Sequence, residues 1–224
     1  MQFNLMIYLL SSAKAFIRKG FLEAISYKVQ FITTIFSIFI GTFIFFTFSK
    51  LFDGTQSALL EPYNYDYFAF SLIGLALTDF TYLVAKSMSN EVRNGQLNGT
   101  LEELFISSNN FKLTLVTIAS YPVVYGLLRM FVFFIIGIIF FDLELNILSN
   151  LRIFFVIILF TIISYLGISL ISASYTFIFK RGDPFNSVFF GISAIFGGVI
   201  YPIEALPGWT IYISKALPIT HILE

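Results

Sequence analysis

Five long apolar runs leave this chain few ways to fold. Each run has 19 or more residues with at most two charged side chains, and a membrane-spanning helix needs about 20. With 58% hydrophobic and 12% charged residues, the chain also lies outside the range of soluble globular domains. The sequence therefore predicts an all-α, polytopic helical membrane protein with spans at residues 29–49, 67–88, 113–141, 153–179 and 185–203.

Basic residues indicate which ends of these spans face the cytoplasm. If the N-terminus is cytoplasmic, the inner segments hold nine Lys and Arg residues, and the outer segments hold three, Lys50, Arg152 and Lys215. Cytoplasmic segments of membrane proteins carry such an excess. We therefore expect a multi-pass protein of the cell membrane with a cytoplasmic N-terminus and with the polar segment Glu91–Asn110 inside the cell.

Residues 1–26 precede the first span and have an amphipathic pattern. Leu9 and Phe16 fall on one helical face, while Lys14 and Arg18 share another. The basic residues follow the apolar ones, which is the reverse of a signal peptide. We expect a helix lying in the membrane interface, with a frayed start of the first span as the alternative.

Five spans that start inside the cell leave the C-terminus outside. A sixth span returning to the cytoplasm would complete the topology, so we expect that this span is missing from the chain. The segment 203–220 is expected to form an outer re-entrant or surface piece. Prolines break it into short parts, and we expect an outer cap formed by Pro202, Glu204, Pro207 and Trp209.

The polar segment contains a compact helix signature at residues 99–108. Thr100 and Glu103 form a capping box, in which the threonine hydroxyl accepts from the Glu103 amide and the glutamate side chain reaches back. Gly95 and Gly99 permit a sharp turn before it. The pattern predicts a discrete helix that begins at the turn.

This short helix has one apolar face. Leu101, Leu104 and Phe105 follow the i, i+3, i+4 spacing. A helix of two to three turns is marginal alone, so its apolar face requires a docking partner. That partner is either another protein or the membrane helices of the chain itself.

Asp79 and Arg129 are ionisable residues within predicted spans. Burying either costs a few kcal/mol, so each should face protein or water and find a partner. At 1.5 Å per residue, Asp79 should lie about 9–13 Å above the cytoplasmic edge and Arg129 about 20 Å or more. A pair could fasten the second span to the third or could line a substrate path, and the structural role is favoured.

Three motifs resemble the membrane subunits of type-2 ABC exporters. Gly99–Leu104 (GTLEEL) resembles their coupling helix, and Lys180–Pro184 (KRGDP) resembles a tight turn between the fourth and fifth spans. Gly197–Trp209, continued by Leu217–His221, resembles the segment after the fifth span. The motifs occur in the expected order along essentially the whole chain, which departs from the family pattern only in the absent sixth span.

The resemblance implies a permease subunit that works with a separate cytoplasmic ATP-binding cassette ATPase. The sequence has no Gly-Lys dipeptide, so a phosphate-binding P-loop cannot form. ATP and Mg are therefore expected on the partner subunit, with no cofactor and no catalytic residue on this chain. By resemblance, the residues that contact the ATPase are Gly99, Thr100, Leu101, Glu102, Leu104 and Phe105.

The resemblance also implies two permease copies in the lipid bilayer around one pathway, as a homodimer or with a related subunit. Such a transporter would move a drug, a lipid or a glycan outward. The sequence does not distinguish between these substrates. The phenylalanines are spread over all the spans and so do not indicate an aromatic binding site for a sugar.

Two other function classes fit a polytopic membrane protein. An ion-coupled secondary transporter or channel would use Asp79 and Arg129 and should contain internal repeats, but no convincing repeat is evident. A membrane enzyme would need clustered catalytic residues, and the single His221 and scattered carboxylates show no such cluster or metal-ligand spacing. A net charge of zero argues against a nucleic-acid partner.

Overall fold

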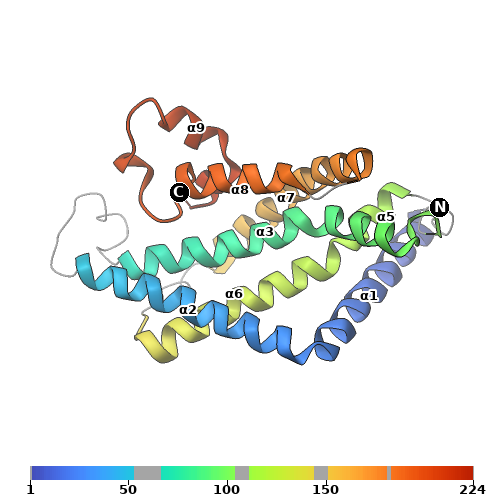
Figure 1. Ribbon diagram of the computed structural model, residues 1–224, viewed down its shortest axis with the longest axis horizontal. Coiled ribbons are helices and arrows are strands. Elements are labelled where there is room, and N and C mark those ends of the chain that lie inside the picture. Colours follow the sequence, from blue (N-terminus) through green and yellow to red (C-terminus); the bar gives the residue numbers. More distant parts are fainter. Residues whose placement is uncertain (1, 53–66, 104–110, 144–150, 181–182, 224) are drawn as a thin grey trace.

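The computed structural model describes residues 2–52, 67–103, 111–143, 151–180 and 183–223. The described elements are all helical, which confirms the predicted all-α class (Figure 1). They are α1 Gln2–Ser26, α2 Lys28–Phe52, α3 Tyr67–Asn98, α5 Phe111–Ile118, α6 Ser120–Phe141, α7 Leu151–Phe179, α8 Pro184–Phe196, η3 Ile203–Ala205, α9 Ile211–Ala216 and α10 Pro218–Leu223.

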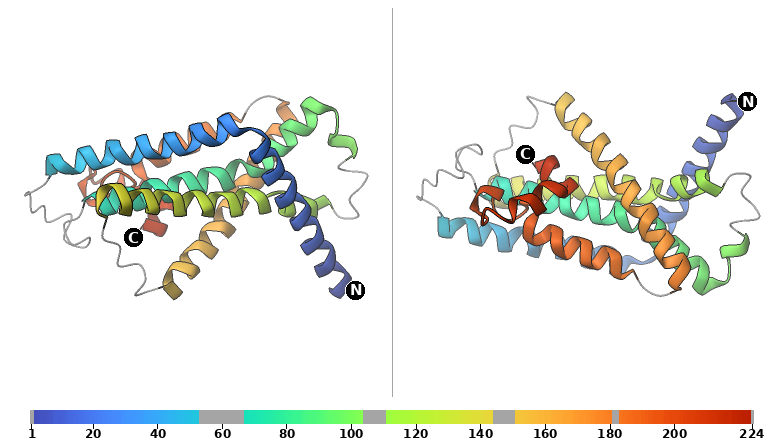
Figure 2. Two further views of the ribbon diagram at one scale, coloured as in Figure 1. Left: turned by 90° about the horizontal axis from the view of Figure 1, so that it is seen from below. Right: turned by 90° about the horizontal axis from the view of Figure 1, so that it is seen from above.

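Helix α3 lies at the centre of the bundle (Figures 1 and 2). It packs mainly against α7 and α6, and α2 also contacts it. In its most apolar stretch 61% of the residues are buried, compared with 11% in α2. Its buried side chains recur every four residues, at Leu72, Ala76, Phe80 and Val84, which places them on one helical face. Helix α3 is therefore the element that connects the other spans.

Two glycines of α6 allow a close approach to α3. A Cβ atom at Gly126 would lie 2.8 Å from the Phe80 ring, and one at Gly137 would lie 2.6 Å from the Leu72 side chain. Small residues are common where membrane helices pack, because lipid gives little hydrophobic drive and close contact must stabilise the interface instead. The contact between α3 and α6 depends on these two positions.

The third apolar run is interrupted near its start. Helix α5 ends at Ile118 and α6 begins at Ser120, with Ala119 between them. Pro122 has no N–H to donate to the Ile118 carbonyl, and its ring crowds that oxygen. The proline therefore accounts for a break one turn before it.

The fifth apolar run forms a shorter helix than we predicted. A span was expected at 185–203, but α8 ends at Phe196 after 13 residues, a rise of about 20 Å against roughly 30 Å of hydrocarbon. Gly197 is its C-cap, Gly198 adopts φ +74° and Pro202 follows. A left-handed glycine and then a proline stop the helix. The short helices after this break lie beside earlier elements, α9 against α8 and α10 against α7.

The non-helical backbone after α8 is covered by protein. Residues 197–199 are buried. Gly74 of α3 lets the Val199 carbonyl approach so closely that a Cβ at Gly74 would lie 2.5 Å from its oxygen. The Tyr67 hydroxyl donates to the Ile200 carbonyl at 2.9 Å. Irregular backbone at membrane depth is tolerated where protein buries it, and α3 provides that cover.

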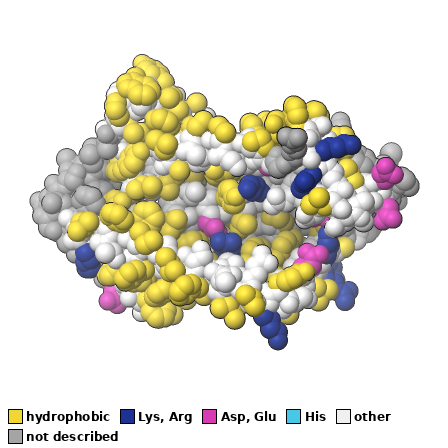
Figure 3. Space-filling view, in the orientation of Figure 1, with side chains coloured by type: hydrophobic (Ala, Val, Ile, Leu, Met, Phe, Trp, Pro, Cys, Tyr) yellow, Lys and Arg dark blue, Asp and Glu magenta, His cyan; other side chains and the backbone are white. Residues whose placement is uncertain are grey.

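Large apolar side chains cover the outer surfaces of the long helices. Exposed examples are Phe36 on α2, Ile139 on α6 and Phe160 on α7. Figure 3 shows hydrophobic side chains across much of one face, with charged side chains in its middle and toward the end where α5 lies. Four described helices are long and apolar enough to cross a membrane: α2, α3, α7 and the run Thr114–Phe141, which is mainly α6. The structure is that of a multi-pass membrane protein.

Candidate functional site

The C-terminal part of α3 extends beyond the predicted span. We expected Gly95 and Gly99 to form a sharp turn, but α3 remains helical to Asn98 and contains Gly95. The turn lies at Gly99, with φ +69°. The Thr100 N–H donates to the Gly95 carbonyl at 3.0 Å, which is the six-to-one bond of a Schellman motif. The predicted coupling segment therefore follows directly from a helix of 32 residues.

Leu101 fixes the start of the coupling segment on the membrane helices. Residues 101–103 are helical, and Leu101 is partly buried. A Cβ at Gly95 would lie 3.2 Å from Leu101 Cδ1, so the glycine makes room for this side chain. Leu101 packs against an apolar cluster formed by Met88, Val92, Leu115, Ile118, Ala119 and Ala173.

The residues predicted to contact an ATPase are thus divided between two environments. Gly99, Thr100 and Glu102 are exposed, whereas Leu101 faces the helices of its own chain. Leu104 and Phe105, with the rest of the predicted helix up to residue 108, lie outside the described residues. Contact between these residues and an ATPase stays a prediction.

Helix α1 is joined to this end of α3 by an ion pair. Lys19 Nζ donates to Glu91 Oε1 at 2.8 Å, with the two side chains 52% and 25% exposed. A pair this exposed stabilises the contact by about 1 kcal/mol or less. The hydrogen bond from Lys19 to Glu91, together with the Glu91 charge, holds the pKa of Lys19 above its ordinary value of 10.5, although partial burial opposes this rise.

Helix α1 also crosses α6 at close range. A Cβ atom at Gly20 would overlap the Tyr121 ring, so only glycine fits beneath it. Phe21 meets the same ring edge-on, with the centroids 5.4 Å apart. This is a favourable geometry for an aromatic pair. Helix α1 is therefore attached to both α3 and α6.

The end of α3 is bonded to the end of α7 as well. Arg93 Nη1 donates to the Lys180 carbonyl at 2.7 Å, and Gln96 Nε2 donates to the Thr176 carbonyl at 3.3 Å. The Lys180 carbonyl lies just past the end of α7, where no helical partner remains for it, whereas the Thr176 carbonyl also accepts from the Lys180 N–H at 3.0 Å. Residues 181–182 of the KRGDP motif lie outside the described residues.

Asp183 and Asn186 fix the start of α8. Asp183 is the N-cap and accepts from the Asn186 N–H at 3.2 Å. Asn186 Nδ2 also donates to Asp183 Oδ2 at 2.6 Å, to the Ser172 hydroxyl at 2.9 Å and to the Ala85 carbonyl at 3.3 Å. The Ser172 hydroxyl donates to Asp183. One fully buried asparagine thus connects α3, α7 and α8.

The two intramembrane charges meet. Arg129 Nη2 lies 2.7 Å from Asp79 Oδ1, and each side chain is 20% exposed. We expected different depths because each was counted from its predicted span limit. Asp79 lies 19 residues before the end of α3 at Asn98, and Arg129 lies 18 residues after the start of α5 at Phe111. Helix α3 and the run formed by α5 and α6 therefore cover almost the same number of residues between the linking segment and their charges. This places Asp79 and Arg129 at the same depth.

The predicted outer-cap residues lie in the segment that follows α8. Pro202 is buried, whereas Glu204, Pro207 and Trp209 are exposed. Their role as a cap stays a prediction. Among the described residues, no group of three His, Asp or Glu side chains could hold a metal ion.

A comparison with protein families identifies the chain. The family model for the ABC-2 type transporter matches residues 11–224, from within α1 to the end of the sequence. The chain belongs to the ABC-2 type transporter family. No curated protein matches the sequence.

This ABC-2 type permease is a membrane component of a transporter, in a family whose members are not themselves catalytic. Family membership implies an ATP-binding partner subunit in general. It also confirms the family resemblance found in the three motifs, and it favours ABC transport over the ion-coupled and enzymatic alternatives.

Sequence reasoning missed several residues of the permease that hold the site together. Lys19 and Glu91 are 72 residues apart, and Arg93 and Lys180 are 87 apart, so no local pattern connects them. The Asp183-Pro184 pair at the start of α8 did carry a local signal, because an N-cap Asp before an N1 Pro is a common helix start. Nothing local indicates the contacts of Asn186 with α3 and α7.

Proposed function

We propose that this ABC-2 type permease exports its substrate across the cell membrane with energy from ATP hydrolysed by a separate cytoplasmic subunit. Its N-terminus and the segment from Gly99 to residue 108 lie in the cytoplasm. ATP and Mg bind to the partner subunit, which docks on this segment. The exported molecule is a drug, a lipid or a glycan.

One structural observation carries this proposal. The coupling segment begins at the Schellman turn that ends α3, and α3 is the most buried of the long helices. The same end of α3 is bonded to α1 through Lys19 and to α7 through Arg93. A displacement of the coupling segment would therefore be passed to several membrane helices through packed and bonded contacts.

A second permease copy completes the transporter in this proposal. The exposed apolar faces of α2 and α7 are long, and such faces need either lipid or another apolar protein surface. Two copies, identical or related, would place one pathway between them. Two-fold dimers are the commonest arrangement of soluble homo-oligomers.

The test is a charge placed on the predicted docking face. We expect Phe105→Glu to weaken co-purification with the ATP-binding subunit about 10-fold or more. In inverted membrane vesicles, the same variant should uncouple ATP hydrolysis from substrate export. Tyr212→Glu is the matched control, because Tyr212 is an exposed aromatic residue on α9, far along the chain from the coupling segment. It should leave both measurements unchanged.

Both variants must insert in the membrane at the level of the unmodified chain. Normal export and a normal ATPase complex in Phe105→Glu would overturn the docking assignment. Loss of both functions in Tyr212→Glu as well would show that the added charge acts through folding.

A further inference from the structure

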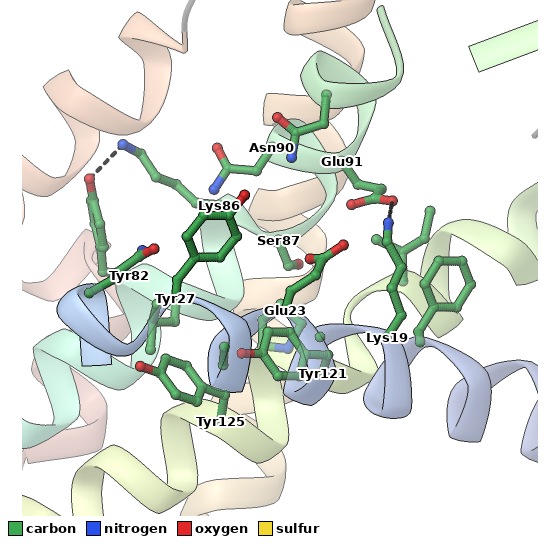
Figure 4. Close-up of a pocket in the computed structure, with 18 of the residues that line it drawn as sticks. Lys19, Glu23, Tyr27, Tyr82, Lys86, Ser87, Asn90, Glu91, Tyr121 and Tyr125 are labelled. Atoms are coloured by element: carbon green, nitrogen blue, oxygen red, sulfur yellow. Dashed lines mark hydrogen bonds and ion pairs between the residues drawn. The ribbon is translucent and has the colours of Figure 1, made fainter. Parts of the chain in front are cut away.

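A polar cavity of about 440 Å³ lies between α1, α3 and the start of α6. Figure 4 shows Lys86, Asn90 and Glu91 of α3 on one side of it, and Glu23 of α1 and Tyr27, between α1 and α2, on another. Lys86 lies near the end of the predicted span 67–88, so the cavity lies at the level where α3 leaves the membrane. Its size falls within the range of small-molecule sites.

The cavity contains one available cation and one available anion. Lys19 and Glu91 neutralise each other. Lys86 Nζ donates to the Tyr82 hydroxyl at 2.5 Å, and no carboxylate of the described residues pairs with it. Within the same described ranges, the Glu23 carboxylate has no hydrogen-bond or ion-pair partner. Lys86 also lies over the Tyr82 ring, 4.5 Å from its centroid, and the charge of Glu23 also acts on Lys19. Neither has a direct ion-pair partner among the described residues, and their opposite signs favour a ligand that carries both signs itself.

Tyrosine rings form the wall beside these charges. Tyr121 and Tyr125 stack with their centroids 5.5 Å apart, and Figure 4 shows both close to Tyr27 and Glu23. Aromatic faces next to a carboxylate are favourable surroundings for an ammonium group. The α1 side of the cavity therefore suits the cationic part of such a ligand, and Lys86 suits the anionic part.

An apolar groove adjoins the polar cavity. It has a volume of about 450 Å³, lies between α1, α2 and α6, and shares Ala24, Phe31 and Tyr125 with the cavity. Along α2 its lining runs from Lys28 to Ile38, a rise of about 15 Å toward the middle of the membrane. The combined shape is that of a polar head followed by an apolar chain.

We propose that the cavity and groove bind one zwitterionic phospholipid whose headgroup carries a primary ammonium and a phosphate, as phosphatidylethanolamine does. The ammonium donates to Glu23 beside the tyrosine wall, the phosphate accepts from Lys86, and one acyl chain lies in the groove. An anionic lipid would leave Glu23 without a cation, and an unpaired charge in a partly buried site is unfavourable. A choline headgroup has no N–H to donate to the carboxylate.

Lipid binding at this site does not depend on the direction of transport or on the coupling segment. It needs only a membrane surface at the level of Lys86. A lipid held there would touch α1, α3 and α6 together, which makes it a structural ligand of the contact between α1 and the spans.

The binding test is native mass spectrometry of the purified full chain, titrated in detergent with dioleoyl lipids that have ethanolamine, choline or glycerol headgroups. We expect one ethanolamine lipid per chain, bound at least about 5-fold more tightly than the other two. Glu23→Gln and Lys86→Gln should each weaken it about 10-fold. The matched controls Glu103→Gln and Lys14→Gln change exposed charges outside the cavity and should have no effect.

The groove is tested separately by fluorescence. Trp209 is the single tryptophan, so a Trp209→Phe, Leu128→Trp variant reports on the groove alone. Brominated acyl chains on an ethanolamine lipid should quench it more strongly than the same chains on a glycerol lipid. Ala24→Phe, which fills the junction of cavity and groove, should abolish this difference.

Three results would overturn the proposal. They are tighter binding of the glycerol lipid, equal losses in Glu23→Gln and its control Glu103→Gln, and disulfide formation between two chains that carry Leu128→Cys. The chain has no native cysteine, so such a disulfide would show that a second copy, and not a lipid, covers the groove.

Discussion

Arg129 of α6 donates a hydrogen bond to Asp79 of α3 across 2.7 Å within the membrane-spanning part of the bundle. This hydrogen bond involves one carboxylate oxygen of Asp79 and one guanidinium nitrogen of Arg129. Asp79 Oδ2 and Arg129 Nε are buried without a hydrogen-bond partner among the described residues. The contact therefore neutralises two charges but leaves hydrogen-bonding capacity unmet. Removal of one member of a buried ion pair leaves the other charge uncompensated, which is more costly than replacement of both members.

Removal of one member of this pair should destabilise the permease more than removal of both. We expect Asp79→Asn and Arg129→Gln each to lower the free energy of unfolding in detergent by about 2–4 kcal/mol. The double variant should lose less stability than either single variant. Strictly additive losses in this double-mutant cycle would contradict a structural pair.

The ion pair between Lys19 and Glu91 should control where α1 lies. Lys19→Glu should broaden the distance distribution between spin labels at Ala15→Cys and Leu97→Cys, because two carboxylates would then face each other. The exchange Lys19→Glu with Glu91→Lys should restore the narrow distribution. The change in stability should stay below about 1 kcal/mol, since the pair is exposed. An unchanged distribution in Lys19→Glu would show that other contacts of α1 suffice.

Above neutral pH, the same spin-label distance should change only at the alkaline end. The pKa of Lys19 is raised by its hydrogen bond to Glu91, so the folded state holds the proton more tightly than the unfolded state. The contribution of the charged lysine is fully present below the ordinary value of 10.5 and is lost as the pH rises through the raised value. We expect a constant distance from about pH 7 to 10, and a Lys19→Gln variant should show no transition above it.

The broken segment after α8 should depend on Gly74. Gly74→Ala would place a Cβ atom 2.5 Å from the Val199 carbonyl oxygen, and backbone cannot move aside cheaply. We expect a loss of about 1–3 kcal/mol in the free energy of unfolding. Gly167→Ala in α7 is the matched control, because no atom lies within 4 Å of its added methyl group. It should be neutral or stabilising, and an equal loss in both variants would exclude a specific contact.

Asn186 should determine the stability of the junction between α3, α7 and α8. Asn186→Ala removes the donor to Asp183, Ser172 and Ala85 at a fully buried position. We expect a loss of about 2–3 kcal/mol and faster protease cleavage near this junction. Ser187→Ala, at an exposed neighbouring position, should change neither measurement. Similar cleavage rates for the two variants would contradict this role.

The sequence predicted well those features of the helices that depend on neighbouring residues. Apolar runs and their length predicted the spans, because lipid requires every backbone group to bond within its own helix. Gly99 was recognised as a turn residue, and the structure gives it φ +69°. Gly95 was misassigned because a glycine inside a helix and a glycine in a turn look alike in sequence. The structure gives the reason why Gly95 stays in the helix: the Leu101 side chain lies beside it.

The end of the fifth run shows where local reasoning stops. Its composition is apolar to residue 203, yet α8 ends at Phe196. Gly197, Gly198 and Pro202 permit the break, but they do not require it. The break is stable because Gly74 of α3 and Ile219 of α10 bury the irregular backbone, and those contacts exist only once the chain has folded.

The sequence by itself determined that this protein is an all-helical, multi-pass permease of the ABC-2 type, since hydrophobic run length and short motifs are properties of neighbouring residues. The tertiary structure decided which charges and polar groups meet: Asp79 with Arg129, Lys19 with Glu91, and Asn186 of α8 with α3 and α7. Partners separated by 50 or more residues along the chain leave no local trace. Their distances are fixed only by how the helices pack around α3.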